Sequence, residues 1–282
     1  MATPVDQSPA EPRRVESHDV VVGGRSLRVV VRPASGPGPS RTPLLICNGI
    51  GAATDVLDPL VDALPANLDV IRFDPPGIGG SAMPSLPYHL TWMAHRLGQV
   101  LTRMGVREVD VMGFSWGGML AQQFALSRRR RVRRLLLAAT GTGALMIPAP
   151  PRVMAAMSTP RRHLDPDYLE TVAPKIYGGS MREHPELAAQ VLMSGERRGP
   201  MRGYYYQLLA LSGWTSLPML GSIRAPTMIL AGDDDPIVPI GNAKQLARGI
   251  RNSRIETYHG GHLELLVDPE RFVPIIDGFL SE

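Results

Sequence analysis

The 282-residue sequence contains one cysteine, Cys47, and has no apolar run of the length that a membrane-spanning helix needs. One cysteine cannot form an internal disulfide or supply a multi-cysteine metal site. A helix that crosses a bilayer needs about 18 or more consecutive apolar residues. We therefore expect no integral membrane association, and the single cysteine agrees with a reducing compartment.

A secretory signal is also missing. Residues 1–14 are rich in proline, alanine and polar residues and lack the apolar segment of such a signal. We interpret residues 1–16 as a flexible leader and expect a cytoplasmic protein. With 44% hydrophobic and 20% charged residues, the composition is that of an ordinary globular protein. The length suits one large domain or one domain with an insertion.

Lysine is scarce, because only Lys175 and Lys244 occur among the 30 basic residues, and the net charge is +4. The densest arginine cluster spans residues 128–134. Such a cluster can bind nucleic acid or an anionic surface. It also follows a predicted helix, whose C-terminal end favours cations. We favour this second interpretation and expect no nucleic-acid partner.

Short apolar, β-branched segments recur along the chain and predict β-strands. The later segments are uninterrupted rather than alternating, which is typical of parallel strands buried on both faces. Helical patterns lie between them, and strands alternating with helices predict an α/β protein with a mostly parallel sheet flanked by helices. The predicted strands are 20–22, 27–31, 44–47, 70–73, 109–112, 135–139, 227–231 and 255–258, and the predicted helices are 55–64, 90–104, 116–126, 243–248 and 269–280.

This alternation stops between residues 142 and 222. The segment is rich in proline and methionine, has helical patches at 185–193 and 204–211, and contains no convincing strand. We expect a mainly helical cap over residues 142–222, inserted after the sixth strand. Residues 17–141 and 223–282 then form the core domain.

Residues 113–117, Gly-Phe-Ser-Trp-Gly, match the nucleophile elbow, a sharp strand-to-helix turn that exposes a serine hydroxyl. Alone, the pattern is weak in a chain this rich in glycine. Here it directly follows a predicted strand and precedes a helical run, which is the context that the elbow requires. We therefore interpret Ser115 as the nucleophile of an α/β-hydrolase fold. The alternative is a serine in an ordinary loop between strand and helix.

A serine nucleophile needs a base and an acid that orients the base, and in this fold they follow the serine in the order acid, histidine. Residues 233–235 are three aspartates directly after the strand 227–231, at the sheet edge where ligands bind. His262 lies on a short glycine loop after the next strand. We expect His262 to be the base, with His259 as its one close rival. One of the three aspartates is the expected acid of the triad. The alternative is that all three only form a solvated turn.

The oxyanion hole needs a second backbone N–H group, from the loop after the third predicted strand. That loop is Asn48-Gly49-Ile50-Gly51. We expect the N–H groups of Ile50 and Trp116 to be the donors. The alternative is a tight glycine turn without a ligand.

Several longer motifs are more specific than the elbow alone. They are residues 48–52, 73–81, 115–125 and 231–236 in the core, and 158–162, 176–179 and 203–216 in the cap. In these segments the chain resembles the intracellular medium-chain-length poly(3-hydroxyalkanoate) depolymerases, and the likeness runs from about Leu27 to Leu280. Most hydrolases of this fold carry His-Gly where this chain has Asn48-Gly49, a departure that leaves a backbone donor undisturbed.

The resemblance implies Ser115 as nucleophile, Asp235 as acid and His262 as base. It implies a cytoplasmic enzyme that attaches to polyester storage granules and releases 3-hydroxyalkanoic acids or short oligomers through an acyl-enzyme. We expect no cofactor and no metal. Met146, Ile147 and Trp214 are our candidates for contact with the aliphatic side chains of the substrate. For each of them, packing of the cap against the core is the alternative.

Three other functions remain open at this point. A small-ester carboxylesterase or lipase would use the same mechanism on another substrate. A non-catalytic granule-binding protein would keep the fold, but it would have no need of a triad. A cofactor-free haloperoxidase-like activity uses similar residues.

Overall fold

The computed structural model describes residues 15–193 and 200–282. An eight-stranded sheet runs in the order β1-β2-β4-β3-β5-β6-β7-β8. The pairs β1–β2 and β2–β4 are antiparallel, and the other neighbouring pairs are parallel. The strands are β1 (Glu16–Val22), β2 (Arg25–Arg32), β3 (Leu44–Cys47), β4 (Val70–Phe73), β5 (Val109–Phe114), β6 (Val132–Ala138), β7 (Thr227–Gly232) and β8 (Ser253–Tyr258). The predicted α/β fold with a mostly parallel sheet is confirmed.

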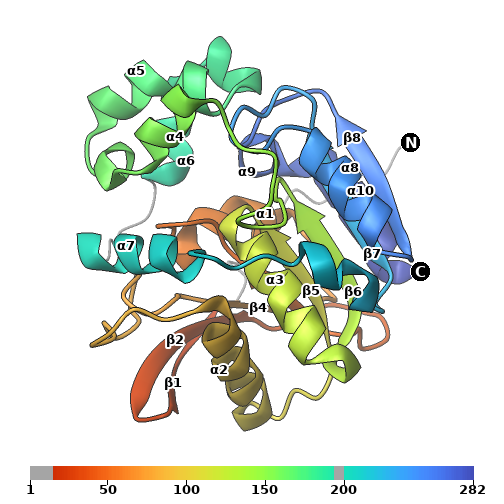
Figure 1. The fold of residues 1–282 in the computed structure, drawn as a ribbon. Coiled ribbons are helices and arrows are strands. Elements are labelled where there is room, and N and C mark those ends of the chain that lie inside the picture. Colours follow the sequence, from red (N-terminus) through yellow and green to blue (C-terminus); the bar gives the residue numbers. More distant parts are fainter. Residues whose placement is uncertain (1–14, 194–199) are drawn as a thin grey trace, which may run out of the picture.

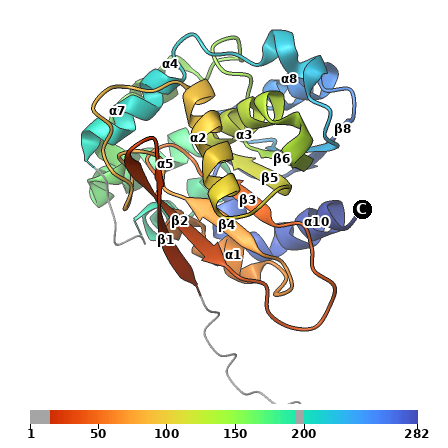
Figure 2. The same ribbon diagram turned by 90° about the horizontal axis from the view of Figure 1, so that it is seen from below.

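Helices cover both faces of this sheet (Figure 2). One face is packed by α2 (Leu90–Arg103), α3 (Trp116–Ser127) and α8 (Gly241–Gly249), and the other by α1 (Asp58–Ala63) and α10 (Pro269–Ser281). Every residue of β3, β4, β5 and β7 is buried. Burial on both faces is why these strands read as uninterrupted apolar runs.

The predicted leader falls largely outside the described residues, because the structure describes the chain from Val15 onward. Its last residue, Glu16, begins β1. The strand is therefore longer at its N-terminal end than the apolar segment 20–22 indicates. The division into leader, core and cap remains a proposal.

The segment between β6 and β7 is helical in its described part. Figure 1 shows α4, α5 and α6 gathered above the core, with α7 below them. Its elements are α4 (Pro151–Met157), η3 (Pro160–His163), α5 (Pro166–Ile176), η4 (Gly179–Arg182), α6 (Glu186–Leu192), α7 (Met201–Ala210) and η5 (Leu217–Ser222), where η marks a 3-10 helix. The described residues of this segment contain no strand, only a single bridge between Gly143 and Thr215.

Two helices of this segment, α4 and α5, escaped the sequence prediction. Both begin with proline in the first turn, and the Asp165 side chain caps α5 by accepting the N–H of Tyr168. Proline fits the first helical turn because the N–H group that it lacks would have no partner there. The prolines thus mark helix starts, and they add two helices to the mainly helical segment that the sequence predicts.

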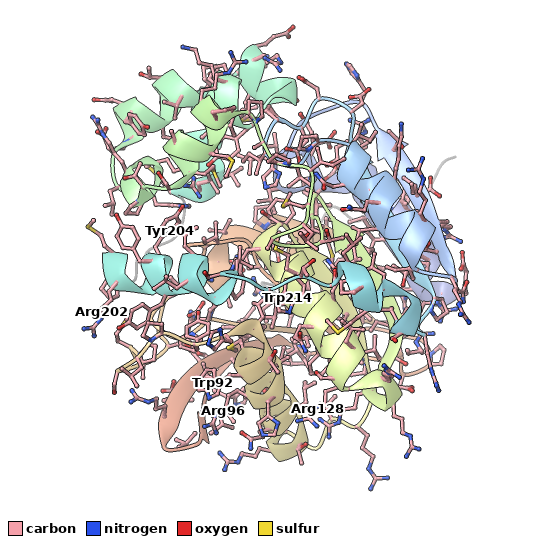
Figure 3. The ribbon with its side chains drawn as sticks, in the orientation of Figure 1. Trp92, Arg96, Arg128, Arg202, Tyr204 and Trp214 are labelled. Carbon is pink, nitrogen blue, oxygen red and sulfur yellow. The ribbon has the colours of Figure 1, made fainter. Side chains whose placement is uncertain are left out.

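Three arginines of the cluster after α3 form hydrogen bonds or ion pairs with other residues of the core. Arg128 contacts the Nδ1 atom of His95 at 2.5 Å, and Arg131 donates to the carbonyl of Gly98 at 2.7 Å. Arg133 forms an ion pair with the buried carboxylate of Asp110. Figure 3 labels Arg128 at the end of α3. In the described chain no helix is both long and apolar enough to span a bilayer.

Candidate active site

Ser115 lies at the turn between β5 and α3 with a left-handed φ of 55°. This conformation costs energy for any residue except glycine, so surrounding contacts must hold it. The Ser115 N–H donates to the carbonyl of Ala138 at 2.9 Å, and the Thr140 hydroxyl donates to the Ser115 carbonyl at 2.7 Å. The turn is thereby fixed to β6 and to the residues that follow it.

The two glycines of the elbow are required by close approach of the backbone. A Cβ atom at Gly117 would lie 2.0 Å from the carbonyl oxygen of Cys47, and one at Gly113 would lie 2.5 Å from the carbonyl oxygen of Gly117. Real Cβ atoms do not come this close to backbone oxygens. The motif therefore has a steric reason at both positions.

The structure brings Ser115, His262 and Asp235 together at hydrogen-bonding distance. The His262 Nε2 atom lies 2.9 Å from the Ser115 Oγ atom, and its Nδ1 atom lies 2.7 Å from the Asp235 Oδ2 atom. The other Asp235 oxygen accepts the backbone N–H groups of Ile237 and Val238 at 2.8 and 2.9 Å. This leaves one carboxylate oxygen aimed at the histidine.

The neighbouring aspartates contact other groups. Asp233 accepts the N–H of Gly260 at 3.0 Å and lies 3.1 Å from His259, whose side chain is 92% exposed. The hydrogen bond between them lowers the pKa of Asp233 and raises the pKa of His259. His259 thus lies at the surface on Asp233, whereas His262 is the histidine that reaches Ser115.

Asp234 connects the core to the cap. Its carboxylate forms two hydrogen bonds of 2.6 Å with the Arg182 guanidinium and accepts the N–H of Gly179 at 2.7 Å. The hydrogen bonds from Arg182 hold the pKa of Asp234 below its usual value. The loop that carries Asp235 is therefore tied to η4.

A second link between cap and core holds the histidine loop. The His262 N–H donates to the carbonyl of Tyr177 at 2.8 Å, and the two rings stack at 6.4 Å. Buried Glu264 accepts the N–H of Gly261 at 3.1 Å and both the N–H and the hydroxyl of Ser180 at 2.6 and 2.8 Å. The sequence analysis assigned no role to Tyr177 or Glu264, because their roles depend on contacts across the insertion, although Tyr177 lies in the motif 176–179 that the resemblance includes.

The predicted oxyanion donors, Ile50 and Trp116, lie beside Ser115 at the wall of one cavity. Trp116 is the first residue of α3, so its N–H group has no partner within the helix. Gln207 of α7 contacts both the residue after Ile50 and the side chain of Trp116. Its Oε1 atom accepts the N–H of Gly51 at 2.7 Å, and its carbonyl accepts the indole N–H of Trp116 at 2.9 Å. The sequence analysis did not single out Gln207.

A cavity of about 430 Å³ opens at Ser115. Its walls are mostly apolar and come from the core and the cap; among them are Met119, Met146, Met154, Met157, Leu208, Leu211 and Val238. Of the predicted substrate contacts, Met146 lines this cavity, whereas Ile147 and Trp214 are absent from its lining. The Trp214 indole instead donates to Gln123 at 2.7 Å, and Ile147 is 44% exposed. Figure 3 labels Trp214 on the segment after α7.

A second cavity next to Ser115, of about 30 Å³, is much smaller. Its lining includes Ser115 and His262 from the core and Arg162, His163 and Tyr177 from the cap. Within the described ranges, no group of three or more histidine, cysteine or acidic residues is placed to hold a metal ion.

The geometry of the site and the topology of the sheet agree with the comparisons with known proteins. A family model described as alpha/beta hydrolase fold matches residues 42–269, and the chain belongs to this family. Over 263 residues it is 44% identical to a protein of Ectopseudomonas oleovorans named poly(3-hydroxyalkanoate) depolymerase, with 93% of this chain and 92% of that protein covered. This relative confirms the resemblance found in the sequence motifs.

More distant relatives share the fold. The chain is 30% identical over 247 residues to a putative carbamate hydrolase of Azorhizobium caulinodans, with 86% of this chain and 92% of that protein covered. The solved structure of an enol-lactonase from Burkholderia xenovorans matches with a TM-score of 0.79 at 20% identity, over 94% of this chain and all of that one. This structural likeness is evidence of the fold alone.

Proposed function

We propose that the chain is a serine esterase that hydrolyses poly(3-hydroxyalkanoate) and releases 3-hydroxyalkanoic acids or short oligomers. The observation that carries this proposal is the hydrogen-bonded chain Ser115–His262–Asp235 at the wall of an apolar cavity of about 430 Å³. A cavity of this size and composition suits the aliphatic side chain of a polyester unit. The name of the 44% identical relative supports the same substrate class.

In the first half-reaction the Ser115 hydroxyl attacks the ester carbonyl carbon while His262 Nε2 takes its proton. Asp235 holds the imidazole in the required tautomer and stabilises its positive charge. The N–H groups of Ile50 and Trp116 stabilise the oxyanion that forms. The ester C–O bond then breaks, and the leaving alkoxide takes the proton from His262.

In the second half-reaction a water molecule attacks the acyl carbon while His262 takes its proton. The bond between the acyl carbon and Ser115 Oγ then breaks, the acyl group leaves as a carboxylic acid, and His262 returns the proton to Ser115. Every proton in this cycle moves through His262, so the reaction needs no cofactor. The cap supplies part of the wall around the acyl group, with Met154 and Met157 from α4 and Leu208 from α7. We place the enzyme in the cytoplasm, on the surface of polyester granules.

The deciding experiment compares latex of a medium-chain polyhydroxyalkanoate with short p-nitrophenyl esters as substrates, and identifies the products by mass spectrometry. We expect release of 3-hydroxyalkanoic acids or oligomers from the latex. Hydrolysis of the short esters alone would contradict the polyester proposal and favour a small-ester carboxylesterase. Inactivity on both would contradict the esterase itself.

A further inference from the structure

The smaller cavity next to Ser115 contains a buried arginine. Arg162 lies on η3 of the cap and is 2% exposed. Its Nε atom donates to the Tyr177 hydroxyl at 3.0 Å, and its Nη1 atom donates to the Tyr204 hydroxyl at 2.8 Å and to the carbonyl of Thr159 at 3.4 Å. Figure 3 labels Tyr204 on α7, the helix below the rest of the cap.

All of these partners are neutral. No carboxylate of the described residues pairs with Arg162, and burial raises the pKa of Tyr177, so this phenol stays protonated at neutral pH. A guanidinium is charged at any pH that a folded protein tolerates. Burying a charge without a counter-ion is costly, and a cation–π contact with the Tyr204 ring at 5.3 Å offsets only part of that cost.

Other buried arginines of the chain are satisfied differently. Arg72 forms an ion pair with Asp58, and Arg32 donates to four backbone carbonyls. Arg162, by contrast, has no hydrogen bond from its Nη2 atom to a described residue, and this atom keeps some exposed surface. Arg162 is one of the residues that line the cavity, and Nη2 is the guanidinium nitrogen whose N–H groups have no hydrogen-bond acceptor among the described residues.

Tyr177 adds a second donor. Its hydroxyl oxygen accepts from Arg162, while its proton has no acceptor among the described residues. Tyr177 lines the same cavity as Ser115 and His262. The volume of about 30 Å³ holds roughly two to three water molecules at about 10–15 Å³ each, so only a group of a few heavy atoms fits there.

We propose that Arg162 and Tyr177 form a subsite for the free carboxylate at the end of the polyester chain. This inference rests on the proposed function. In a 3-hydroxyalkanoate chain, two carbon atoms separate the terminal carboxylate from the oxygen of the last ester. A carboxylate held in the cavity next to Ser115 therefore presents that last ester to the nucleophile.

The reaction then proceeds from the carboxyl end. The last ester C–O bond breaks, the leaving alkoxide takes its proton from His262, and one 3-hydroxyalkanoic acid departs with its carboxylate unchanged. Water then releases the shortened chain from Ser115 as a new free carboxylate. That carboxylate is the group that the subsite binds in the next cycle.

The test compares two synthetic trimers of 3-hydroxyoctanoate, one with a free terminal carboxylate and one with a primary carboxamide there. Cleavage of the last ester is followed by chromatography with mass detection, and kcat/KM is measured for each trimer. We expect the wild-type enzyme to prefer the carboxylate about 10- to 100-fold, the range for hydrogen bonds to charged groups. Equal rates for the two trimers would overturn the subsite.

Variants separate binding from packing. In Arg162→Gln we expect the carboxylate preference to disappear, and in Tyr177→Phe we expect it to weaken. Arg161→Gln is the matched control, because it removes the same charge from a neighbouring, 60% exposed side chain that pairs with Asp165. A preference that persists in Arg162→Gln, or one that Arg161→Gln also abolishes, would contradict the proposal.

Two further results keep the test decisive. If Arg162→Gln does not fold by circular dichroism, Arg162→Lys retains the charge without the planar fork and should keep only part of the preference. Full preference in folded Arg162→Lys and Tyr177→Phe would overturn the subsite. If the wild-type enzyme releases nothing from the latex and cleaves neither trimer, the proposed function fails. Activity on the latex combined with equal cleavage of the two trimers, or with none, removes only the carboxylate subsite.

Discussion

Two cavities meet at Ser115, and they differ in both size and chemistry. The larger one, of about 430 Å³, has mostly apolar walls that include four methionine and two leucine side chains, whereas the smaller one, of about 30 Å³, is lined in part by the buried side chain of Arg162. Ile50 and Ser115 line both. The nucleophile thus lies between a mostly apolar wall and a buried positive charge, as the proposed subsite requires. A 3-hydroxyalkanoate chain end has both an apolar side chain and a charged carboxylate.

Ser115 is shared by the two cavities, so its loss is expected to have the largest effect. Ser115→Ala should lower kcat by about 10⁶-fold on carboxylate and carboxamide trimers alike, because the nucleophile is removed. Steady-state kinetics on both trimers measures kcat, and circular dichroism shows whether the variant is folded. A fluorophosphonate probe should label Ser115 and no other serine. Near-normal turnover in the variant, or labelling elsewhere, would move the nucleophile.

Asp235 comes next, because it acts on both substrates through His262. Asp235→Asn should lower turnover by up to about 10⁴-fold, since the amide favours the wrong imidazole tautomer. Asp234→Asn is the matched control, because this carboxylate contacts Arg182 and Gly179 instead. We expect a much smaller loss there. A milder effect in Asp235→Asn than in Asp234→Asn would mean that the acid is misassigned.

Gln207 lies on the cap and holds the loop of Ile50, which also belongs to both cavities. Gln207→Leu removes the acceptor of the Gly51 N–H, so the loop is expected to shift and turnover to fall by about 100-fold, the lower end for loss of an oxyanion donor. Both trimers should be affected equally. Gln207→Glu retains the acceptor and should recover most of kcat. Failure of this rescue would assign Gln207 a packing role only.

The next prediction concerns the larger cavity alone. Met146 lines it and Trp214 does not, so the two residues make a matched pair. Met146→Ala should lower hydrolysis of a medium-chain p-nitrophenyl ester more than that of the acetate, by about 10-fold, as for lost apolar pocket contacts. In Trp214→Ala we expect both rates to fall equally, because its indole is bound to Gln123. A selective loss in Trp214→Ala would restore it as a substrate contact.

These variants also mark what the sequence could predict. Strand periodicity and the elbow motif are local, so the sequence alone predicts the sheet and places Ser115, Asp235 and His262 at one edge of it. The structure brings these three side chains within hydrogen-bonding distance, and their catalytic roles remain predictions. The apolar character of the cap was equally visible, but it could not tell Met146, in the cavity wall, from Trp214.

The residues that escaped prediction depend on contacts between distant segments. Gln207 meets Gly51 across 156 positions, and Arg162 meets Tyr204 across 42 positions. No local pattern distinguishes buried Arg162 from exposed Arg161 beside it. The motif at residues 158–162 could have pointed to Arg162, because the resemblance to the family includes this segment and nothing in its helical or charge pattern explains its two arginines.

The smallest effect is expected at the link between the cap and the acid loop, outside both cavities. Arg182 and Asp234 form an ion pair with each other. Their side chains are 51% and 35% exposed, so solvent screens the interaction. Arg182→Gln should lower the free energy of unfolding at pH 7 by no more than about 1 kcal/mol, the upper range for exposed pairs. The carboxylate preference should stay unchanged, because neither residue lines the smaller cavity.

The pH dependence gives this last prediction its sign. The pKa of Asp234 is held below its usual value by Arg182, so the pair stabilises the folded state above the pKa of the unfolded carboxyl, about 4. This contribution is lost as the pH falls through the lowered pKa. The difference in unfolding free energy between wild type and Arg182→Gln, measured by urea denaturation, should therefore shrink as the pH is lowered below about 4. A difference that is constant with pH would show that Arg182 stabilises the link by packing rather than by charge.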